Sequence, residues 1–162
     1  MQEVRMNTFS LKLEESVNVE YCLPPEDPKG ELSHLEMGLR LFCFRNNQKV
    51  LIKLGKKRKE IFLDPDIILV LEELPEKIYQ LLIGQNIELD FPESGFAISF
   101  KSLDTWKINC IWQEYGYSHE THKFTLERVQ VLYVFRRFLR DLVNKAVKQG
   151  YISDQEKKEF MK

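Results

Sequence analysis

The histidine pair of this sequence lies in the run His119-Glu120-Thr121-His122. Two histidines three residues apart can bind one metal ion from a helix face, but a third ligand such as Glu114 would be needed. The run lies between an expected strand and an expected helix, and the H-E-x-x-H spacing of zinc proteases is absent. The sequence therefore favours a solvated polar loop here and predicts no metal ligand.

No other group of residues has the spacing of a known catalytic centre. The Gly-x-Ser-x-Gly turn that presents a nucleophilic serine is absent, and so is a glycine-rich loop that would hold phosphate. Chance carboxylate pairs are expected in a chain with 25 Asp and Glu residues. The sequence predicts no catalytic residue and no cofactor, and an enzyme with a carboxylate or His119/His122 centre is the less favoured alternative.

Aromatic side chains concentrate in the segment 112–122, which contains Trp112, Tyr115, Tyr117, His119 and His122. Exposed Tyr and Trp side chains are typical of protein-binding hot spots. The alternative is that Trp112 belongs to the core and that the tyrosines fold back over the sheet. We take these five residues as the candidate protein-binding surface.

Two basic groups of residues raise the question of nucleic acid binding. The run Lys56–Lys59 is expected on a hairpin turn, and Arg136, Arg137 and Arg140 lie within about one turn of an expected helix. The net charge of −1 lacks the positive excess of a dedicated nucleic-acid binder. A nucleic-acid-binding module using Lys56–Lys59 is therefore a second alternative. The charge is uneven along the chain, since the segment Glu14–Glu36 is acidic.

Cysteine usage and hydropathy give the expected compartment. Cys22, Cys43 and Cys110 are scattered without C-x-x-C spacing, which is typical of small core residues in a reducing cytoplasm. The first residues lack the apolar stretch of a signal peptide, and the apolar run Ile67–Leu71 is too short to span a membrane. We expect a cytoplasmic protein without a membrane partner, and the sequence predicts no oligomeric state.

The first half of the chain is expected to form strands, because apolar and polar residues alternate with period two. Strands are predicted at 9–13, 17–21, 36–45, 50–54 and 61–63, with turns at 46–48 and 55–59. Asp64-Pro65 then predicts a helix start, and Pro75 predicts that this helix breaks before a second one ending at Gly84. The expected result is a Pro-broken helix inserted in the middle of the chain.

The second half is expected to begin with an antiparallel meander and to end in helices. Strands are predicted at 87–91, 96–101 and 106–113, and a long helix from Thr125 to Gln149 carries an apolar stripe that includes Phe135, Phe138 and Leu142. Ser153 and Glu156 form a capping box that predicts a short last helix.

These elements predict one α+β domain over residues 1–162. An antiparallel sheet of about six to eight strands is expected to pack against the long C-terminal helix and the Pro-broken helix. The function expected from a small, charge-patterned chain without catalytic motifs is intracellular protein binding. An example is a bacterial immunity or antitoxin-type inhibitor that masks the active surface of its partner.

Overall fold

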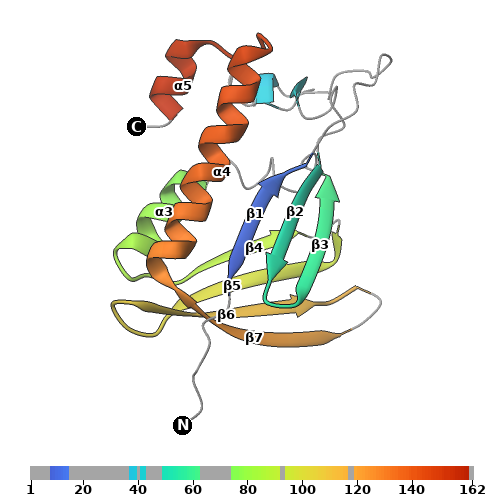
Figure 1. Ribbon diagram of the computed structural model, residues 1–162, viewed down its shortest axis with the longest axis vertical. Coiled ribbons are helices and arrows are strands. Elements are labelled where there is room, and N and C mark those ends of the chain that lie inside the picture. The colour runs from blue at the N-terminus through green and yellow to red at the C-terminus, as the bar shows by residue number, and fades with distance from the viewer. Residues whose placement is uncertain are drawn as a thin grey trace, which may run out of the picture.

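The computed structural model describes residues 8–14, 37–39, 41–42, 49–62, 74–91, 94–116 and 119–160. These residues form two antiparallel sheets and helices beside them (Figure 1). The α+β class and the antiparallel pairing are confirmed. The expectation of one sheet is wrong, because the seven strands of the described residues divide into a sheet of three and a sheet of four.

The three-stranded sheet has the order β1-β2-β3, with β1 at Phe9–Leu13, β2 at Lys49–Leu54 and β3 at Lys57–Phe62. The β2–β3 hairpin turns at Gly55 and Lys56, where Gly55 has a φ of 59°, a backbone conformation that favours glycine. The basic run was expected on this turn, but only Lys56 lies there. Lys57, Arg58 and Lys59 continue into β3, because the two-residue turn leaves them in register with β2.

The four-stranded sheet is a meander with the order β4-β5-β6-β7. Its strands are β4 at Ile87–Phe91, β5 at Phe96–Ser102, β6 at Lys107–Glu114 and β7 at Glu120–Glu127. β4 alternates strictly between buried and exposed residues, as the sequence predicts for one buried face. β7 was not predicted, and it replaces residues 120–122 of the expected loop at 119–122 and the expected first turn of the long helix.

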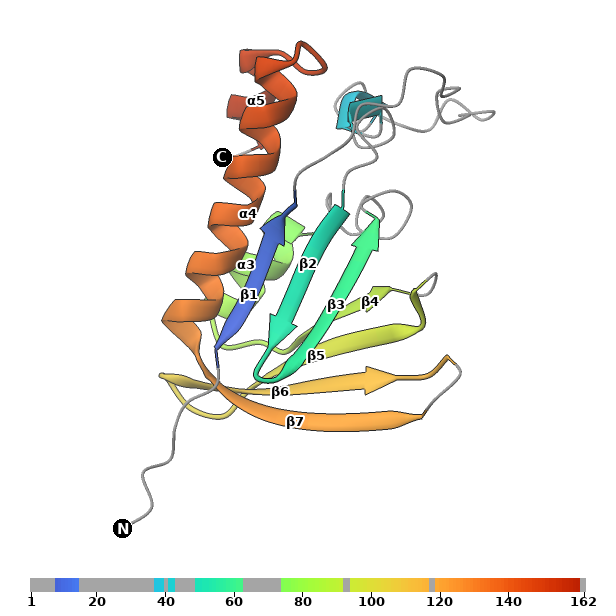
Figure 2. The same ribbon diagram turned by 45° about the vertical axis from the view of Figure 1, so that its right-hand side comes forward.

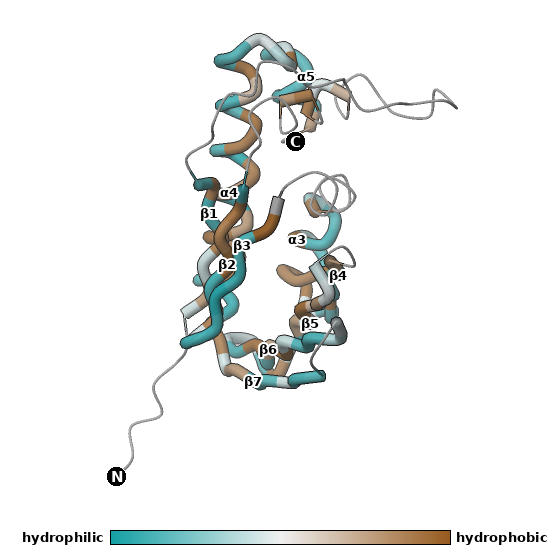
Figure 3. Tube along the Cα trace, turned by 90° about the vertical axis from the view of Figure 1, so that its right-hand side faces the viewer, coloured by the Kyte–Doolittle hydropathy of each residue, from teal (hydrophilic) through white to brown (hydrophobic). Residues whose placement is uncertain are grey.

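The strands of the two sheets cross at a steep angle (Figures 1 and 2), and apolar residues of both sheets belong to one core cluster. Figure 3 shows the three-stranded sheet opposite β4 and β5, with β6 and β7 at the closed side between them. The rings of Phe9 in one sheet and Phe100 in the other are in contact, with 5.5 Å between their centroids. The ring centroid of Phe135, on the long helix, lies 5.2 Å from that of Phe9. One hydrophobic core cluster therefore includes residues from both sheets and the helices.

The long helix α4 spans Arg128–Lys148 and follows β7 without a loop. Its predicted apolar stripe is confirmed, since Phe135, Phe138 and Leu142 are buried. α4 runs beside β1 in the same direction, and its second half continues past the end of the strand (Figures 1 and 2). This helix therefore flanks the outer strand of the three-stranded sheet.

The last helix, α5 at Asp154–Phe160, begins at the predicted capping box. The Ser153 amide donates to Glu156 Oε1 at 3.0 Å, and the Glu156 amide donates to Ser153 Oγ at 3.1 Å. These two bonds satisfy amides that have no partner within the helix.

α3 spans Leu74–Leu82 and carries Pro75 in its first turn, where the missing N–H is not needed. The expected helix start at Asp64-Pro65 lies outside the described residues, as do the predicted strand at 17–21 and the turn at 46–48.

The strand predicted at 36–45 is wrong, because residues 37–39 and 41–42 are helical. Leu39 and Phe42 are both buried, and a spacing of three residues puts them on one helix face. The Phe42 ring lies 5.8 Å from Tyr151, and a Cβ at Gly38 would lie 2.4 Å from the Tyr151 carbonyl oxygen. The alternation of apolar residues over 36–45 was therefore misleading. Leu39 and Phe42 are buried on one face of a helix, and Gly38 allows this helix to approach the backbone at Tyr151.

Candidate functional site

The structure separates the five residues of the predicted binding surface. Trp112 has no exposed surface and stacks on Phe96, with 5.0 Å between ring centroids. It therefore belongs to the core and is not available to a partner. Tyr117 lies outside the described residues, and the role of the other three residues stays a prediction.

Tyr115, His119 and His122 lie at the end of the four-stranded sheet. The Tyr115 hydroxyl donates to Asp90 Oδ1 at 2.5 Å, which fixes the ring against β4. His122 lies opposite Trp112 on β7, and its Nε2 is 3.2 Å from Glu120 Oε2. His119 is exposed just before β7. The residues Glu120–His122 are therefore part of a strand rather than a loop, and His119 directly precedes it.

Two basic residues of β3, Lys57 and Lys59, form ion pairs with the facing sheet, whereas Arg58 pairs with Glu60 of its own strand. Lys57 Nζ is 3.1 Å from Glu120 Oε2, and Lys59 Nζ is 3.6 Å from Glu114 Oε1. The hydrogen bond from His122 and the nearby Lys57 ammonium lower the pKa of Glu120. Because these lysines already neutralise carboxylates, β3 offers little free positive charge for phosphates.

Chemical reactivity has little support among the described residues. They contain no group of three or more His, Cys, Asp and Glu side chains arranged to hold a metal ion. Burial raises the pKa of the Cys110 thiol, so this cysteine is a core residue on β6 rather than a nucleophile. Cys22 and Cys43 lie outside the described residues.

A groove lies between β1 and α4, and its volume is about 770 Å³. One wall is β1 from Thr8 to Leu13, and the other is a single face of α4. The groove exists because β1 ends the three-stranded sheet, and only one edge of β1 pairs with a strand.

The hydrogen-bond pattern of β1 determines which backbone groups point into the groove. The Glu14 amide donates to the Lys49 carbonyl, and the Gly55 amide donates to the Thr8 carbonyl. In an antiparallel pair, bonded and non-bonded residues alternate, so Ser10 and Lys12 face β2 with their N–H and C=O groups. The N–H and C=O groups of Phe9, Leu11 and Leu13 therefore point outward, toward α4.

Gln130 of α4 forms hydrogen bonds with both outward backbone groups of Phe9, the first of these residues. Its Nε2 donates to the Phe9 carbonyl at 2.6 Å, and its Oε1 accepts from the Phe9 amide at 3.3 Å. Within the described part of the chain, the outward groups of Leu11 and Leu13 have no such partner. The groove thus presents two consecutive open positions of a β-strand edge.

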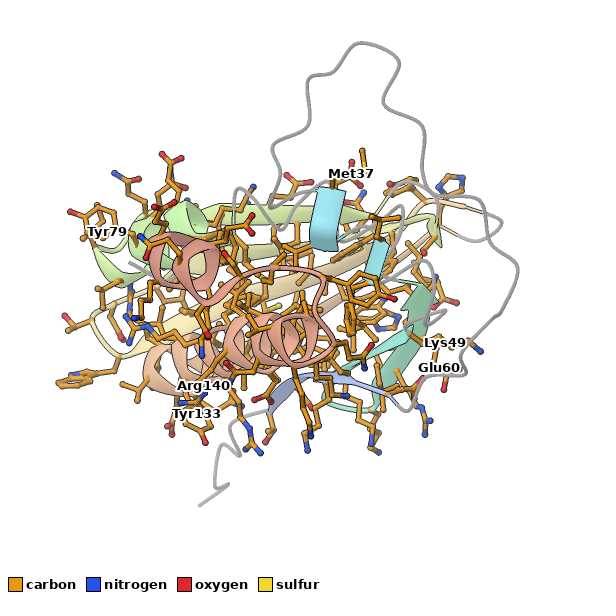
Figure 4. All side chains as sticks on the ribbon, turned by 90° about the horizontal axis from the view of Figure 1, so that it is seen from above. Met37, Lys49, Glu60, Tyr79, Tyr133 and Arg140 are labelled. Atoms are coloured by element: carbon orange, nitrogen blue, oxygen red, sulfur yellow. The ribbon has the colours of Figure 1, made fainter. Side chains whose placement is uncertain are left out.

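The α4 wall of the groove combines aromatic, apolar and charged side chains. Tyr133 is 57% exposed, and the next residue, Val134, is half-buried. Farther along the helix, Arg137 Nε is 3.7 Å from Asp141 Oδ2, and Lys145 lies one turn beyond. Figure 4 shows Tyr133 and Arg140 at the outer side of α4, away from Tyr79 of α3.

A second surface gathers exposed apolar residues at the junction of α3, the β5–β6 turn and the start of α4. Leu82, Leu103, Trp106 and Val129 are exposed there, Trp106 by 70%. Trp106 was expected to begin a strand, and this is wrong. Asp104 Oδ1 accepts from the amides of Trp106 and Lys107, and these bonds hold the chain in a turn until Lys107.

Arg128, the first residue of α4, connects α3 with the β5–β6 turn at this junction. Its guanidinium donates to the carbonyls of Leu81 and Asp104, both at 2.6 Å, and to the carbonyl of Thr105 at 3.1 Å. Arg128 is buried, whereas the arginines singled out from the sequence, such as Arg136, are exposed. The structural arginine of α4 is therefore one that sequence reasoning missed.

No protein-family model, curated protein or solved structure matches this chain. The helices of the described residues include none that is long and apolar enough to cross a membrane. Function must therefore be inferred from the geometry of the groove and of the surfaces described above.

Sequence reasoning missed the groove because it depends on which edge of β1 is paired. The residues that form it are ordinary in the sequence: Ser10, Leu11 and Lys12 on the strand, and a helix face of mixed polar and apolar residues opposite. One signal was available, since Gln130 is a polar residue only one position before the buried Val131 and could have been examined as a partner for a strand edge.

Proposed function

We propose that this protein is a protein-binding module that takes an extended segment of its partner as an added strand on β1. The observation that carries the proposal is the open edge of β1, where the N–H and C=O groups of Leu11 and Leu13 point into the groove beside α4. A strand placed there would continue the sheet and satisfy these groups. Such strand addition is a common mode of peptide recognition.

Gln130 indicates how the added strand would bond. At Phe9 its side-chain amide makes the two hydrogen bonds that a paired residue makes, one as donor and one as acceptor. The open positions follow directly at Leu11 and Leu13. A segment of about five residues, about 17 Å long, would cover this stretch.

The walls of the groove add side-chain contacts to the backbone bonds. Side chains of an added strand alternate between two sides, so every second one would face the inner part of the groove. There, Val134 and Leu13 are half-buried apolar residues beside the buried Phe138, and Tyr133 stands exposed above them. These residues favour a partner segment with alternating apolar side chains.

Protein binding was the function expected from the sequence, and the groove moves the proposed surface from segment 112–122 to β1 and α4. Covering the active surface of a partner, as an inhibitor does, is one consequence that such binding can have. The acidic or aromatic features of other surfaces are not needed for it.

The experiment is a screen of short linear peptides displayed on phage, followed by measurement of Kd for the selected peptides. Leu13→Pro is the diagnostic variant, because its N–H faces the groove and proline there removes no bond to β2. Binding should be lost in Leu13→Pro while the melting transition stays cooperative. In the parent chain, the Leu11 and Leu13 amides should become protected from hydrogen exchange when peptide binds.

A matched pair of variants tests the helix wall. Tyr133→Ala should weaken peptide binding, whereas Tyr79→Ala should not, although the two tyrosines are 57% and 59% exposed. Peptides that bind equally well to Leu13→Pro would contradict strand addition. Binding that appears only after residues 17–21 are replaced by Gly and Ser would show that the chain itself supplies the added segment, which also contradicts the proposal.

A further inference from the structure

The groove is lined by more basic than acidic residues. This excess indicates the charge of the partner segment, an inference that rests on the proposed function. The charged residues that line the groove are Lys12, Arg137 and Lys145, which are basic, and Asp141, which is acidic. Asp141 pairs with Arg137 on the helix surface. Two positive charges therefore remain, one on each wall.

Lys12 and Lys145 are the two remaining charges, and neither has an ion-pair partner among the described residues. Both are exposed, Lys12 on β1 and Lys145 near the end of α4. Lysine side chains are long enough to turn toward a bound segment. A segment lying between β1 and α4 would thus meet two ammonium groups, one from each wall.

The direction of the two walls places these lysines toward one end. β1 and α4 start together at the Phe9–Gln130 contact and run the same way (Figures 1 and 2). Along β1, Lys12 is about 10 Å beyond Phe9, and along α4, Lys145 is about 22 Å beyond Gln130. The groove is therefore apolar and aromatic near Tyr133 and basic from Lys12 onward.

We infer that the partner segment is an acidic extended peptide, with Asp or Glu residues at the end of the segment that lies toward Lys12 and Lys145. Complementary charges would orient the segment as well as attract it. A nucleic acid strand fits less well, because it cannot continue the hydrogen-bond ladder of β1. Among the described residues of the groove it would meet only two cations without an ion-pair partner.

The test uses three synthetic peptides that share an alternating Val-Thr stretch and differ only at one end, which carries Glu, Gln or Lys residues. The Glu peptide should bind about tenfold more tightly than the Gln peptide at low salt, and the Lys peptide more weakly than both. Salt should reduce these differences, since exposed charges are screened. Placing the Glu residues at the other end should remove most of the preference.

Charge reversal in the protein gives the decisive comparison. The double variant K12E/K145E should prefer the Lys peptide over the Glu peptide. The control K101E/K158E makes the same change in net charge on an exposed strand residue and an exposed helix residue outside the groove. It should retain the preference for the Glu peptide.

The outcomes separate this inference from the proposed function. Three peptides that bind equally, and are all lost in Leu13→Pro, would overturn the acidic partner and leave strand addition standing. Absence of binding by any peptide in this set and in the phage screen would overturn both. A single-stranded oligonucleotide that displaces the Glu peptide and binds more tightly, with loss in K12E/K145E, would replace the acidic peptide by nucleic acid.

Discussion

The side-chain amide of Gln130 bonds both backbone groups of Phe9, which lies 121 residues earlier in the chain. This contact fixes the start of α4 to the outer edge of β1. It also ends the groove, because the next outward positions of β1 have no comparable partner in the described part of the chain.

Replacing this glutamine should reduce stability and lengthen the open edge. Gln130→Ala removes one donor and one acceptor, each part-buried, and should lower the free energy of unfolding by about 1–2 kcal/mol. Urea denaturation would measure the loss, with Gln113→Ala on the exposed face of β6 as the control. A loss no larger than that of the control would mean that water replaces the amide at Phe9 without penalty.

Replacing Arg128 should reduce stability more strongly. Arg128→Met leaves three carbonyl oxygens, at Leu81, Asp104 and Thr105, without their charged donor. The expected loss is about 3 kcal/mol, and Arg128→Lys should recover only part of it, because a single ammonium cannot reach three acceptors in a fork. Thermal and urea unfolding would compare both variants with Arg136→Met, which changes an exposed arginine of the same helix.

Full recovery of stability by Arg128→Lys would contradict the importance of the fork geometry. It would show instead that any positive charge at the end of α3 is sufficient, since cations stabilise helix C-termini.

The buried stripe of α4 gives a prediction for the core. Phe138 has 2% of its surface exposed and lies between the sheets and the helix, so Phe138→Ala should destabilise the fold by about 3–5 kcal/mol. Tyr133→Ala, on the exposed face of the same helix, should change stability by less than about 1 kcal/mol. Equal losses in the two variants would mean that the helix packs in a different rotation.

The parts of the fold that could be predicted from the sequence are those with local signals. Period-two alternation identified β1, β2 and the β4–β6 meander, and the buried stripe identified α4. The Ser153–Glu156 capping box is confirmed at the start of α5. Each of these features depends on neighbours within a few residues, which the sequence contains directly.

The sequence of β7 contains a strand pattern, but the helical pattern of α4 that follows it is stronger. Phe124 and Leu126 alternate with Lys123 and Thr125, and β-branched threonines favour strands. The helix predicted from the apolar stripe starts at Thr125 and therefore overlaps this alternation. Because β7 passes into α4 without a loop, no turn residue marks the boundary between them.

The division into two sheets and the groove could not be predicted from local patterns. Which strand lies at an edge depends on pairing between distant segments, and β1 pairs with a strand that begins 36 residues after β1 ends. Which backbone groups point outward depends on the register of that pairing. Trp112 shows the same limit, since its stacking on Phe96 follows from the β5–β6 register and not from its aromatic neighbours in sequence.

The last prediction concerns acid stability. Hydrogen bonds from the backbone amides of Trp106 and Lys107 lower the pKa of Asp104 below its ordinary value. A carboxylate whose pKa is lower in the folded than in the unfolded chain stabilises the fold at pH values above its unfolded pKa, and this stabilisation is lost as the pH falls through the folded pKa.

Asp104→Asn keeps an oxygen acceptor at the turn but removes the charge, so it isolates this effect. The free energy of unfolding of the variant should be lower than that of the parent chain at neutral pH, and the difference should shrink as the pH falls below about 4. Glu14, whose pKa is raised by burial and by its hydrogen bond with Glu60, contributes with the opposite sign. Because Glu14 is present in both chains, its contribution cancels in the difference. Urea denaturation of the two chains at a series of pH values would measure the difference in their free energies of unfolding. If this difference stays constant down to pH values well below about 4, the charge of Asp104 is not what stabilises the turn.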